Sequence, residues 1–313
     1  MKIVFRDRPP GPEVIAELRQ TFPDVDIRDG TDDAAFARDI GDADAVVGGR
    51  WTESLLAKAG KLAWLQSIYA GVDDLPLDAF VARGVAVTNF RGVSAVSISE
   101  HVLALMFAFA RGLPSLFDRQ KNGVWLPQAQ RPTLFELTGQ QVGILGYGAL
   151  GSAVAQACHR NGMRVVTCYR TERSFPDFVE CAYPLSEIEA MLGSVDHLVL
   201  VLPSTPDTRG LMNRSRLFAM KKGAYLYNVG RGDAVDSDAL VAALTEGHLG
   251  GAGLDVTDPE PLPSDSALWK LGNVIITGHT AGMSPRRWER GMEIIVENIR
   301  RFRAGEVLLN RVG

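Results

Sequence analysis

The sequence has few cysteines, no excess of basic residues and no long apolar run. Its three cysteines among 313 residues, Cys158, Cys168 and Cys181, are odd in number and lack the close paired spacing of metal sites. We therefore expect reduced structural thiols and no metal. The formal net charge of −4, without a basic run, argues against a nucleic-acid partner. No apolar stretch approaches membrane-spanning length and the first residues are typical of a strand, which predicts a cytoplasmic protein with no membrane partner.

Short apolar segments alternate with helical stretches along the chain. A length of 313 residues exceeds the usual size of a single core and predicts two domains. Repeated strand-then-helix order is typical of α/β folds, in which a doubly wound parallel sheet is covered on both faces. The N-terminal region is expected to hold strands at 3–5, 25–27, 45–47, 62–68 and 85–88, and helices at 13–20, 33–40, 53–58 and 77–82.

A glycine-rich turn follows the apolar segment 142–145. It consists of Gly146, Tyr147, Gly148, Ala149, Leu150 and Gly151. If the apolar segment is a strand, Gly146 permits a tight turn, Gly148 lets the backbone approach a pyrophosphate, and Gly151 lets the next helix pack closely. The free N–H groups and the dipole of that helix favour an anion. With a helix at 152–160 and a strand at 164–168, the pattern predicts a dinucleotide-binding βαβ unit.

The rest of the chain continues the alternation and adds three unusual segments. Strands are expected at 197–202, 224–228, 251–255 and 274–277, and helices at 186–192, 214–220 and 237–246. A connecting helix at 97–111 is apolar nearly all round, which implies burial on every side. A final helix at 286–302 is expected to return to the first domain. Segment 114–138 is interpreted as an arm that needs a partner surface, a subunit interface being one option, because it carries Trp125, Leu126, Leu134, Phe135 and Leu137.

Three charged or titratable residues, Arg231, Glu260 and His279, follow expected strands of the second domain. The carboxyl ends of parallel strands share one edge, so these side chains can converge on one crevice. Taken singly, Arg231 could be a surface arginine, Glu260 a solvated turn residue and His279 a loop histidine. Together they suit hydride transfer to a 2-oxo acid. An arginine fork holds the carboxylate and polarises the carbonyl, while a histidine beside a carboxylate serves as a general acid.

The chain carries a set of motifs that includes these residues. They are Tyr69-Ala70-Gly71-Val72-Asp73, Glu100-His101-Val102-Leu103-Ala104, Gly146-x-Gly148-x-x-Gly151, Asn228-Val229-Gly230-Arg231-Gly232, Leu254-Asp255-Val256 followed by Pro259-Glu260-Pro261-Leu262-Pro263, and Gly278-His279-Thr280-Ala281-Gly282. The set is highly specific and resembles, over essentially the whole chain, the signatures of the D-isomer-specific 2-hydroxyacid dehydrogenase family. The resemblance implies a Rossmann cofactor domain, residues 99–285, inserted into a flavodoxin-like substrate domain, residues 1–98 and 286–313, and a homodimer built around the cofactor domain.

The resemblance also implies the roles of individual residues. Arg231, Glu260 and His279 form the catalytic triad, with Arg231 anchoring the substrate carboxylate and His279, paired with Glu260, acting as general acid and base. The amides of Ala70, Gly71 and Val72 bind the substrate carboxylate. Asp255 lies near the nicotinamide carboxamide. The residues expected to bind the cofactor are Gly146, Tyr147, Gly148, Ala149, Leu150, Gly151, Arg170, Thr171, Arg173, Leu202, Pro203, Thr208, Val229, Gly230, Arg231, Asp255, His279, Ala281 and Gly282.

The expected activity is reduction of a small 2-oxo acid, of the glyoxylate or hydroxypyruvate type, to the D-2-hydroxy acid by hydride transfer from NAD(P)H. Trp51, Tyr69 and Phe90 are candidates for shaping the substrate pocket because each adjoins a loop of the first domain, although a core position is the alternative. A non-catalytic NAD(P)-sensing regulator of the same fold is the alternative function. A formate-oxidising relative resembles this pattern but has a glutamine where Glu260 stands here.

The end of the strand at 164–168 bears on the choice of cofactor. NAD enzymes of this fold place an acidic residue there to bind the ribose hydroxyls, but this chain has Tyr169. Arg170 and Arg173 can pair with a 2′-phosphate, and Thr171 can donate a hydrogen bond to it. The sequence therefore predicts a preference for NADP(H). NAD is the alternative, in which both arginines are solvated and Glu172 serves the ribose.

Overall fold

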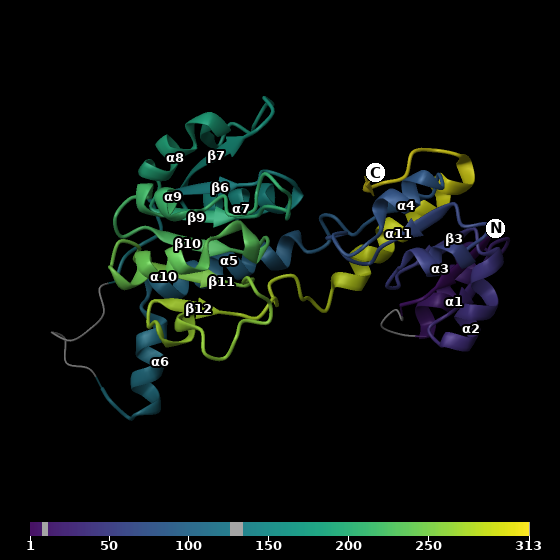
Figure 1. Ribbon diagram of the computed structural model, residues 1–313, viewed down its shortest axis with the longest axis horizontal. Coiled ribbons are helices and arrows are strands. Elements are labelled where there is room, and N and C mark those ends of the chain that lie inside the picture. Colours follow the sequence, from purple (N-terminus) through teal and green to yellow (C-terminus); the bar gives the residue numbers. More distant parts are fainter. Residues whose placement is uncertain (8–11, 126–133, 313) are drawn as a thin grey trace. The chain divides into compact units, whose positions relative to one another are not determined.

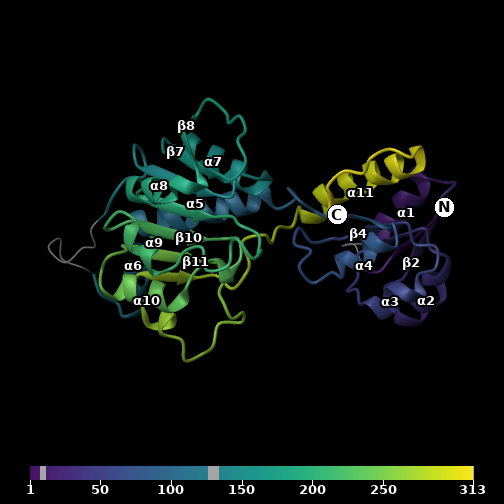
Figure 2. The same ribbon diagram turned by 45° about the horizontal axis from the view of Figure 1, so that its top comes forward.

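The protein divides into two compact units, Met1–Ser94 with Ser284–Gly313, and Ala95–Met283 (Figures 1 and 2). The computed structural model describes residues 1–7, 12–125 and 134–312. The sequence placed the boundaries after residues 98 and 285. The first boundary lies earlier because helix α5 (Ala95–Ala110) begins at Ala95 and packs against α7 (Ala149–Arg160) of the second unit.

The first unit is built on a six-stranded sheet in the order β13-β5-β4-β3-β1-β2. Strands β1 to β5 are parallel to one another and, read from β2, lie in the flavodoxin-like order 2-1-3-4-5. β13 pairs antiparallel with β5 at the edge, a strand that the sequence pattern did not predict. The strands are β1 (Lys2–Phe5), β2 (Asp26–Asp29), β3 (Ala45–Val47), β4 (Trp64–Gln66), β5 (Ala86–Thr88) and β13 (Arg311–Val312).

Helices cover both faces of this sheet. Successive side chains of a strand point to opposite sides, so a strand that is apolar throughout needs a covering layer on each face. Ile3 and Phe5 belong to the cluster that includes α1 (Pro12–Thr21) and α11 (Arg287–Ala304). Val4 belongs to the opposite cluster. That cluster is completed by α2 (Asp33–Asp39), the 3₁₀ turn η1 (Ile40–Asp42), α3 (Glu53–Lys58) and α4 (Leu77–Ala82). The last helix therefore belongs to the first unit, to which it was expected to return.

The second unit is built on a seven-stranded parallel sheet in the order β12-β11-β10-β9-β6-β7-β8. Read from β8, the first six strands have the Rossmann order 3-2-1-4-5-6. β8 is not an apolar run and was missed from the sequence. The strands are β6 (Gln141–Leu145), β7 (Arg164–Tyr169), β8 (Val179–Pro184), β9 (His197–Leu200), β10 (Tyr225–Asn228), β11 (Gly251–Leu254) and β12 (Val274–Ile276).

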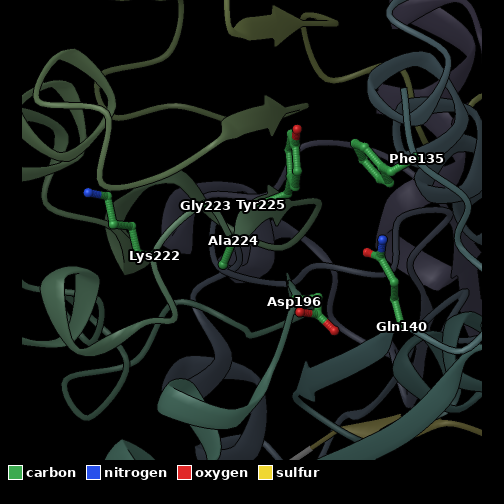
Figure 3. Close-up of a pocket in the computed structure, with 7 residues that line it drawn as sticks. All are labelled: Phe135, Gln140, Asp196, Lys222, Gly223, Ala224 and Tyr225. Carbon is green, nitrogen blue, oxygen red and sulfur yellow. The ribbon is translucent and has the colours of Figure 1, made fainter. Parts of the chain in front are cut away.

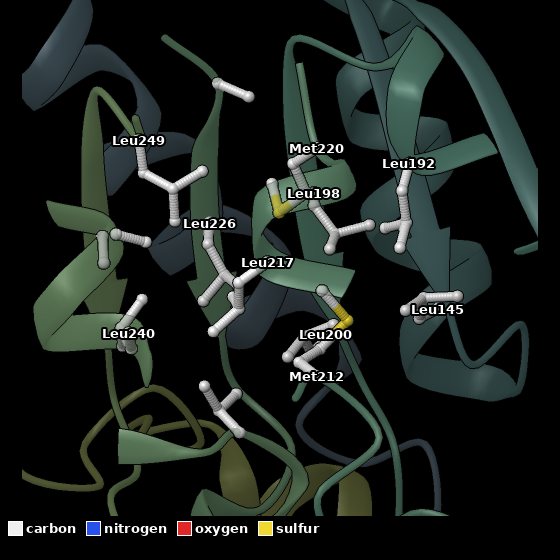
Figure 4. Close-up of a cluster of buried hydrophobic side chains, with 14 of the residues drawn as sticks. Leu145, Leu192, Leu198, Leu200, Met212, Leu217, Met220, Leu226, Leu240 and Leu249 are labelled. Carbon is white, nitrogen blue, oxygen red and sulfur yellow. The ribbon is translucent and has the colours of Figure 1, made fainter. Parts of the chain in front are cut away.

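Two cores lie on the two faces of this sheet. One packs α5 and α7 against alternate strand residues such as Val142 and Ile144. The other packs Leu145, Leu200 and Leu226 against helices on the opposite face (Figure 4). Those helices are α8 (Ile188–Ser194), α9 (Arg214–Ala219) and α10 (Ser237–Thr245), with the 3₁₀ turns η3 (Leu185–Glu187), η4 (Gly232–Ala234) and η5 (Ala267–Lys270) in the connections. Both unit sheets are thus doubly wound, as the alternating pattern predicted.

The structure corrects two expectations for the segment that follows the first domain. α5 is not buried on every side, because Phe107 is 41% exposed. The expected arm begins with a regular helix, α6 (Leu113–Lys121), since Pro114 lies in its first turn, where its missing N–H costs nothing. Within the expected arm, Trp125 and Leu134 are exposed, Phe135 and Leu137 pack against the α5–α7 core, and Leu126 lies outside the described residues.

Among the described residues, no single helix is both long and apolar enough to cross a membrane; only α5 and α6 together, bent by 69°, meet the length and composition criteria. The cysteine expectation needs one correction. Cys158 and Cys168 are buried, and burial raises the pKa of these thiols to about 12 and about 11, whereas Cys181 is exposed and has no structural role in a core.

Candidate active site

The glycine-rich turn connects β6 to α7 and has the geometry of a phosphate cradle. Gly146 has a φ of +100°, which only glycine adopts without strain. A Cβ on Gly151 would lie 1.9 Å from the carbonyl oxygen of Gly146, so the helix can pack this closely only at a glycine. Gly148 is the N-cap of α7, and a Cβ there would meet no atom within 4 Å of it among the described residues. The open N-terminus of a twelve-residue helix therefore fits the pyrophosphate of a nicotinamide dinucleotide.

Two arginines follow β7 beside this turn. Nη1 of Arg173 donates a hydrogen bond to the carbonyl oxygen of Tyr147 at 3.1 Å, and its guanidinium lies 5.5 Å from the ring centre of Phe175. Arg170 pairs with Asp207 at 3.0 Å, and both side chains are well exposed. Tyr169 is half-buried, while Thr171 and Glu172 are exposed. The structure thus brings Arg173 to the glycine turn and gives Arg170 a carboxylate partner that the sequence pattern did not identify.

Glu260 and His279 are in direct contact. They follow β11 and β12, and Nδ1 of His279 lies 2.6 Å from Oε1 of Glu260. A carboxylate can only accept, so Nδ1 carries the proton in this bond and Nε2 is the ring nitrogen left for proton exchange with a substrate. Both side chains are about half exposed. His279 has a φ of +61°, an uncommon backbone conformation for a residue with a side chain.

Arg231 follows β10 at the carboxyl edge of the same sheet. The side-chain amide of Asn228 donates to the carbonyl oxygen of Arg231 at 2.8 Å, and its carbonyl oxygen accepts from the amide of Gly230 at 3.1 Å. These two bonds fix the backbone on either side of the arginine. Nη1 of Arg231 donates to the carbonyl oxygen of Gly230 at 3.0 Å. The half-buried guanidinium is therefore carried by a rigid turn rather than by a mobile loop.

Asp255 holds the loop that carries His279. Its carboxylate is buried and accepts bonds from the amide of Thr280 at 2.8 Å, the amide of Ala281 at 3.0 Å and the hydroxyl of Thr277 at 2.6 Å. Its backbone carbonyl accepts from the amide of His279 at 2.6 Å. The sequence motif suggested Asp255 only as a nicotinamide neighbour. Its role as the anchor of the loop was missed, because the loop amides carry no sequence signal.

Ala281 and Gly282 follow β12, and the remaining cofactor candidates follow β9 and β10 at the same carboxyl edge. Leu202 and Pro203 follow β9, and the hydroxyl of Thr208 donates to the carbonyl oxygen of Pro203 at 2.6 Å. Val229 and Gly230 follow β10, where a Cβ on Gly230 would lie 2.7 Å from the backbone of Leu202. Both loops therefore lie side by side at the edge that also carries the glycine turn.

The substrate candidates of the first unit differ in accessibility. Trp51 and Phe90 are buried in opposite cores of that unit, so they occupy the core positions that were the alternative. Tyr69 is 56% exposed, and the guanidinium of Arg287 lies 5.4 Å from its ring centre. In the loop that follows β4, Ala70 is exposed, Gly71 and Val72 are half-buried, and Asn89 holds the carbonyl oxygen of Ala70 at 2.7 Å.

A cavity of about 220 Å³ lies at the opposite edge of the second unit's sheet (Figure 3). Its lining includes Gln140, Asp196 and Ala224, which directly precede β6, β9 and β10. Because the amino ends of parallel strands form the edge opposite to the carboxyl ends, this cavity is separate from the candidate site. The candidate site is therefore marked by its charged and titratable residues, Arg231, Glu260 and His279, and not by this cavity.

Comparison with known proteins agrees with this geometry. The family described as "D-isomer specific 2-hydroxyacid dehydrogenase, NAD binding domain" matches residues 103–281. The glyoxylate reductase of Pyrococcus furiosus is 32% identical over 86% of this chain and 82% of its own length. The D-3-phosphoglycerate dehydrogenase of Methanocaldococcus jannaschii is 30% identical over the whole chain, which spans 59% of that relative.

Solved structures lead to the same family. The NADPH-dependent glyoxylate/hydroxypyruvate reductase of Sinorhizobium meliloti, solved with NADP and sulfate, is 29% identical with a TM-score of 0.82, over 99% of this chain and 98% of that one. The chain therefore belongs to the D-isomer-specific 2-hydroxyacid dehydrogenase family and is an NAD(P)-dependent enzyme.

Proposed function

We propose that this enzyme reduces a small 2-oxo acid, of the glyoxylate or hydroxypyruvate type, to the D-2-hydroxy acid, with NADPH as the preferred hydride donor. The observation that carries the proposal is the 2.6 Å contact between His279 and Glu260, made at the sheet edge that also carries Arg231 and the glycine turn. A cation, an oriented acid and a dinucleotide cradle on one edge are the parts that carbonyl reduction of an anionic substrate needs.

The residues act in three ways. Arg231 holds the substrate carboxylate and polarises the carbonyl to be reduced, because its planar fork can donate two parallel hydrogen bonds. Nε2 of His279 donates a proton to the carbonyl oxygen, and Glu260 keeps the ring oriented and stabilises the imidazolium through Nδ1. The nicotinamide, when bound, supplies the hydride. In the reverse direction His279 accepts the proton.

The preference for NADPH rests on the residues after β7. A 2′-phosphate placed between Arg170, Thr171 and Arg173 would gain charge-assisted bonds, and no acidic residue ends the strand where Tyr169 stands. Arg173 is already held by the carbonyl oxygen of Tyr147, whereas Arg170 would exchange its bond to Asp207 for one to the phosphate. The related S. meliloti enzyme is named NADPH-dependent.

The cofactor proposal is tested by comparing catalytic efficiency with NADPH and NADH at one fixed substrate concentration. We expect the wild type to favour NADPH and Arg170→Ala to lose most of that preference while keeping its activity with NADH. A wild type that favours NADH, with Glu172 serving the ribose, would contradict the proposal. So would an unchanged cofactor ratio in Arg170→Ala.

The substrate proposal is tested with a panel of acids. The names of some relatives point to glyoxylate and hydroxypyruvate, and D-3-phosphoglycerate is the second candidate because several other relatives are named D-3-phosphoglycerate dehydrogenase. We expect the highest efficiency on glyoxylate or hydroxypyruvate. The highest efficiency on a branched or aromatic 2-oxo acid, or in oxidation of D-3-phosphoglycerate, would contradict the proposal. Absence of turnover with every acid would favour a regulator of the same fold.

Two further roles belong to the proposal. Tyr69 and the amides of Ala70, Gly71 and Val72 remain the proposed contacts of the substrate from the first unit, and they are tested by Tyr69→Ala in the same panel.

Homodimer formation is proposed from the exposed apolar side chains of Leu116, Phe117 and Trp125, which need a covering surface. Light scattering of the purified protein tests the assembly, and a monomer at micromolar concentration would contradict it.

A further inference from the structure

His101 lies on α5, in a motif whose role the catalytic triad does not explain. Its Nε2 atom lies 3.0 Å from the hydroxyl oxygen of Thr277, a residue 176 positions later in the chain. The Thr277 hydroxyl lies 2.6 Å from Oδ1 of Asp255, and His101 itself lies 3.8 Å from that oxygen. A chain of polar groups therefore runs from the helix to the carboxylate that anchors the His279 loop.

The direction of these hydrogen bonds follows from the donor inventory. A buried carboxylate can only accept, so the single proton of the Thr277 hydroxyl points to Asp255. The lone pairs of the same hydroxyl oxygen are then left for His101, which must donate from Nε2. His101 thus fixes the rotation of the Thr277 hydroxyl, and that hydroxyl in turn fixes one oxygen of Asp255.

Asp255 needs this support because it restrains a strained segment. Its carboxylate oxygens accept from the amides of Thr280 and Ala281, and its carbonyl accepts from the amide of His279. His279 has a φ of +61°, a conformation that persists only where the surroundings enforce it. A carboxylate free to rotate would release both amides and with them the orientation of the imidazole.

We propose that His101 is a positioning residue for His279, acting through Thr277 and Asp255. The inference rests on the proposed role of His279 as the acid, since it concerns how that acid is held. Among the described contacts, His101 lies against Thr277 and Asp255 and not against His279 itself. Its contribution is to limit the carboxylate of Asp255, whose side chain is only 2% exposed, to the one rotation that holds the loop.

The first test measures the loop directly in the ligand-free protein. Hydrogen–deuterium exchange, read amide by amide by NMR, reports the opening of the bonds from Thr280 and Ala281 to Asp255. We expect His101→Ala and Thr277→Val to speed exchange of these two amides by about tenfold or more. His101→Gln and Thr277→Ser, which keep a donor and a hydroxyl, should keep exchange near the wild-type rate.

The second test splits kcat from KM on the best 2-oxo acid. If His279 becomes more mobile, Arg231 still holds the substrate carboxylate. The value of kcat should therefore fall by about tenfold in His101→Ala and Thr277→Val, while KM stays within about threefold. The conservative pair should again resemble the wild type. A merely structural role for His101 would move the melting temperature without this split and without rescue by glutamine.

His197 supplies a matched control. It is a histidine of the second unit that is fully buried, whereas His101 is half-buried, and it begins β9 at the amino edge and bonds Gln140 and Tyr227. His197→Gln is therefore expected to leave the two loop amides and kcat unchanged. The proposal requires both the faster exchange and the lower kcat in Thr277→Val, which keeps the side-chain shape, so absence of either overturns it. Failure of the proposed function would give a different result. In that case His279→Asn would keep wild-type activity, irrespective of the exchange rates of the Thr280 and Ala281 amides.

Discussion

Nδ1 of His279 and Oε1 of Glu260 lie 2.6 Å apart, although the two residues follow different strands and His279 has a positive φ. The pair fixes the orientation of the imidazole, and in the proposed reaction Nε2 is the atom that donates the proton to the substrate. Glu260→Gln keeps the side-chain shape but removes the charge that stabilises the imidazolium. A charge-assisted bond of this kind contributes about 1.5 to 3 kcal/mol, so kcat/KM should fall about 10- to 100-fold. Glu289→Gln, an exposed carboxylate of the first unit, is the control, and an equal loss there would contradict the assignment.

Arg231 should tolerate neither loss nor replacement by lysine. Arg231→Ala removes a charged contact to the substrate carboxylate and should cost about 3 kcal/mol or more in kcat/KM. Arg231→Lys keeps the charge but not the planar fork, so it should recover only part of the loss. Arg214→Ala, which removes an exposed arginine of the same unit paired with Glu246, should have no effect. Near-wild-type efficiency of Arg231→Ala on every 2-oxo acid would refute the role.

Two of the three glycines of the cradle, Gly148 and Gly151, should respond differently to alanine. At Gly151 the added Cβ would lie 1.9 Å from a backbone oxygen, so Gly151→Ala should lower both the melting temperature and the affinity for NADPH. At Gly148 the added Cβ meets open space in the protein but stands where a pyrophosphate would approach. Gly148→Ala should therefore weaken NADPH binding, measured by calorimetry, without lowering the melting temperature. Unchanged affinity in Gly148→Ala would place the pyrophosphate elsewhere.

The buried His197 should make stability depend on pH. Burial lowers its pKa to about 4 from an ordinary value of 6.5. The unfolded chain therefore binds a proton below about pH 6.5 that the folded chain does not bind until about pH 4. His197 thus contributes stability that is fully present above pH 6.5 and is lost as the pH falls from 6.5 to 4, by about 3 kcal/mol in total.

Urea unfolding of the wild type and His197→Gln at several pH values checks this dependence. Glutamine can still bond Gln140 but does not titrate. The free energy of unfolding of the variant should fall less steeply than that of the wild type between pH 6.5 and pH 4. Parallel curves for the two proteins would show that His197 is not held neutral by burial.

Elements with strong apolar periodicity could be predicted from the sequence, and elements that depend on distant partners could not. β1, β6 and β9 are buried on both faces, so their apolar runs identified them. β8 lies at the sheet edge and has only half-buried and exposed residues, and β13 has two residues that pair only because the C-terminus returns to β5. Such edge strands take their structure from the neighbour rather than from their own composition.

The same distinction applies to the candidate site. Glu260 and His279 were found because each follows a strand end, and parallel strands bring such ends together. Three polar contacts had no such signal: His101 with Thr277, Asp255 with the loop amides, and Arg170 with Asp207. They join residues 176, 25 and 37 positions apart through side-chain directions that only the packed structure determines.

The most direct test of the central claim follows oxidation of NADPH by the wild type and by His279→Asn with glyoxylate and with hydroxypyruvate, and determines the configuration of the product from hydroxypyruvate. The account predicts rapid turnover by the wild type, a D-2-hydroxy acid as product, and loss of at least about a thousandfold in kcat for the variant that lacks the acid. Turnover by His279→Asn at the wild-type rate, or an L-configured product, would contradict it.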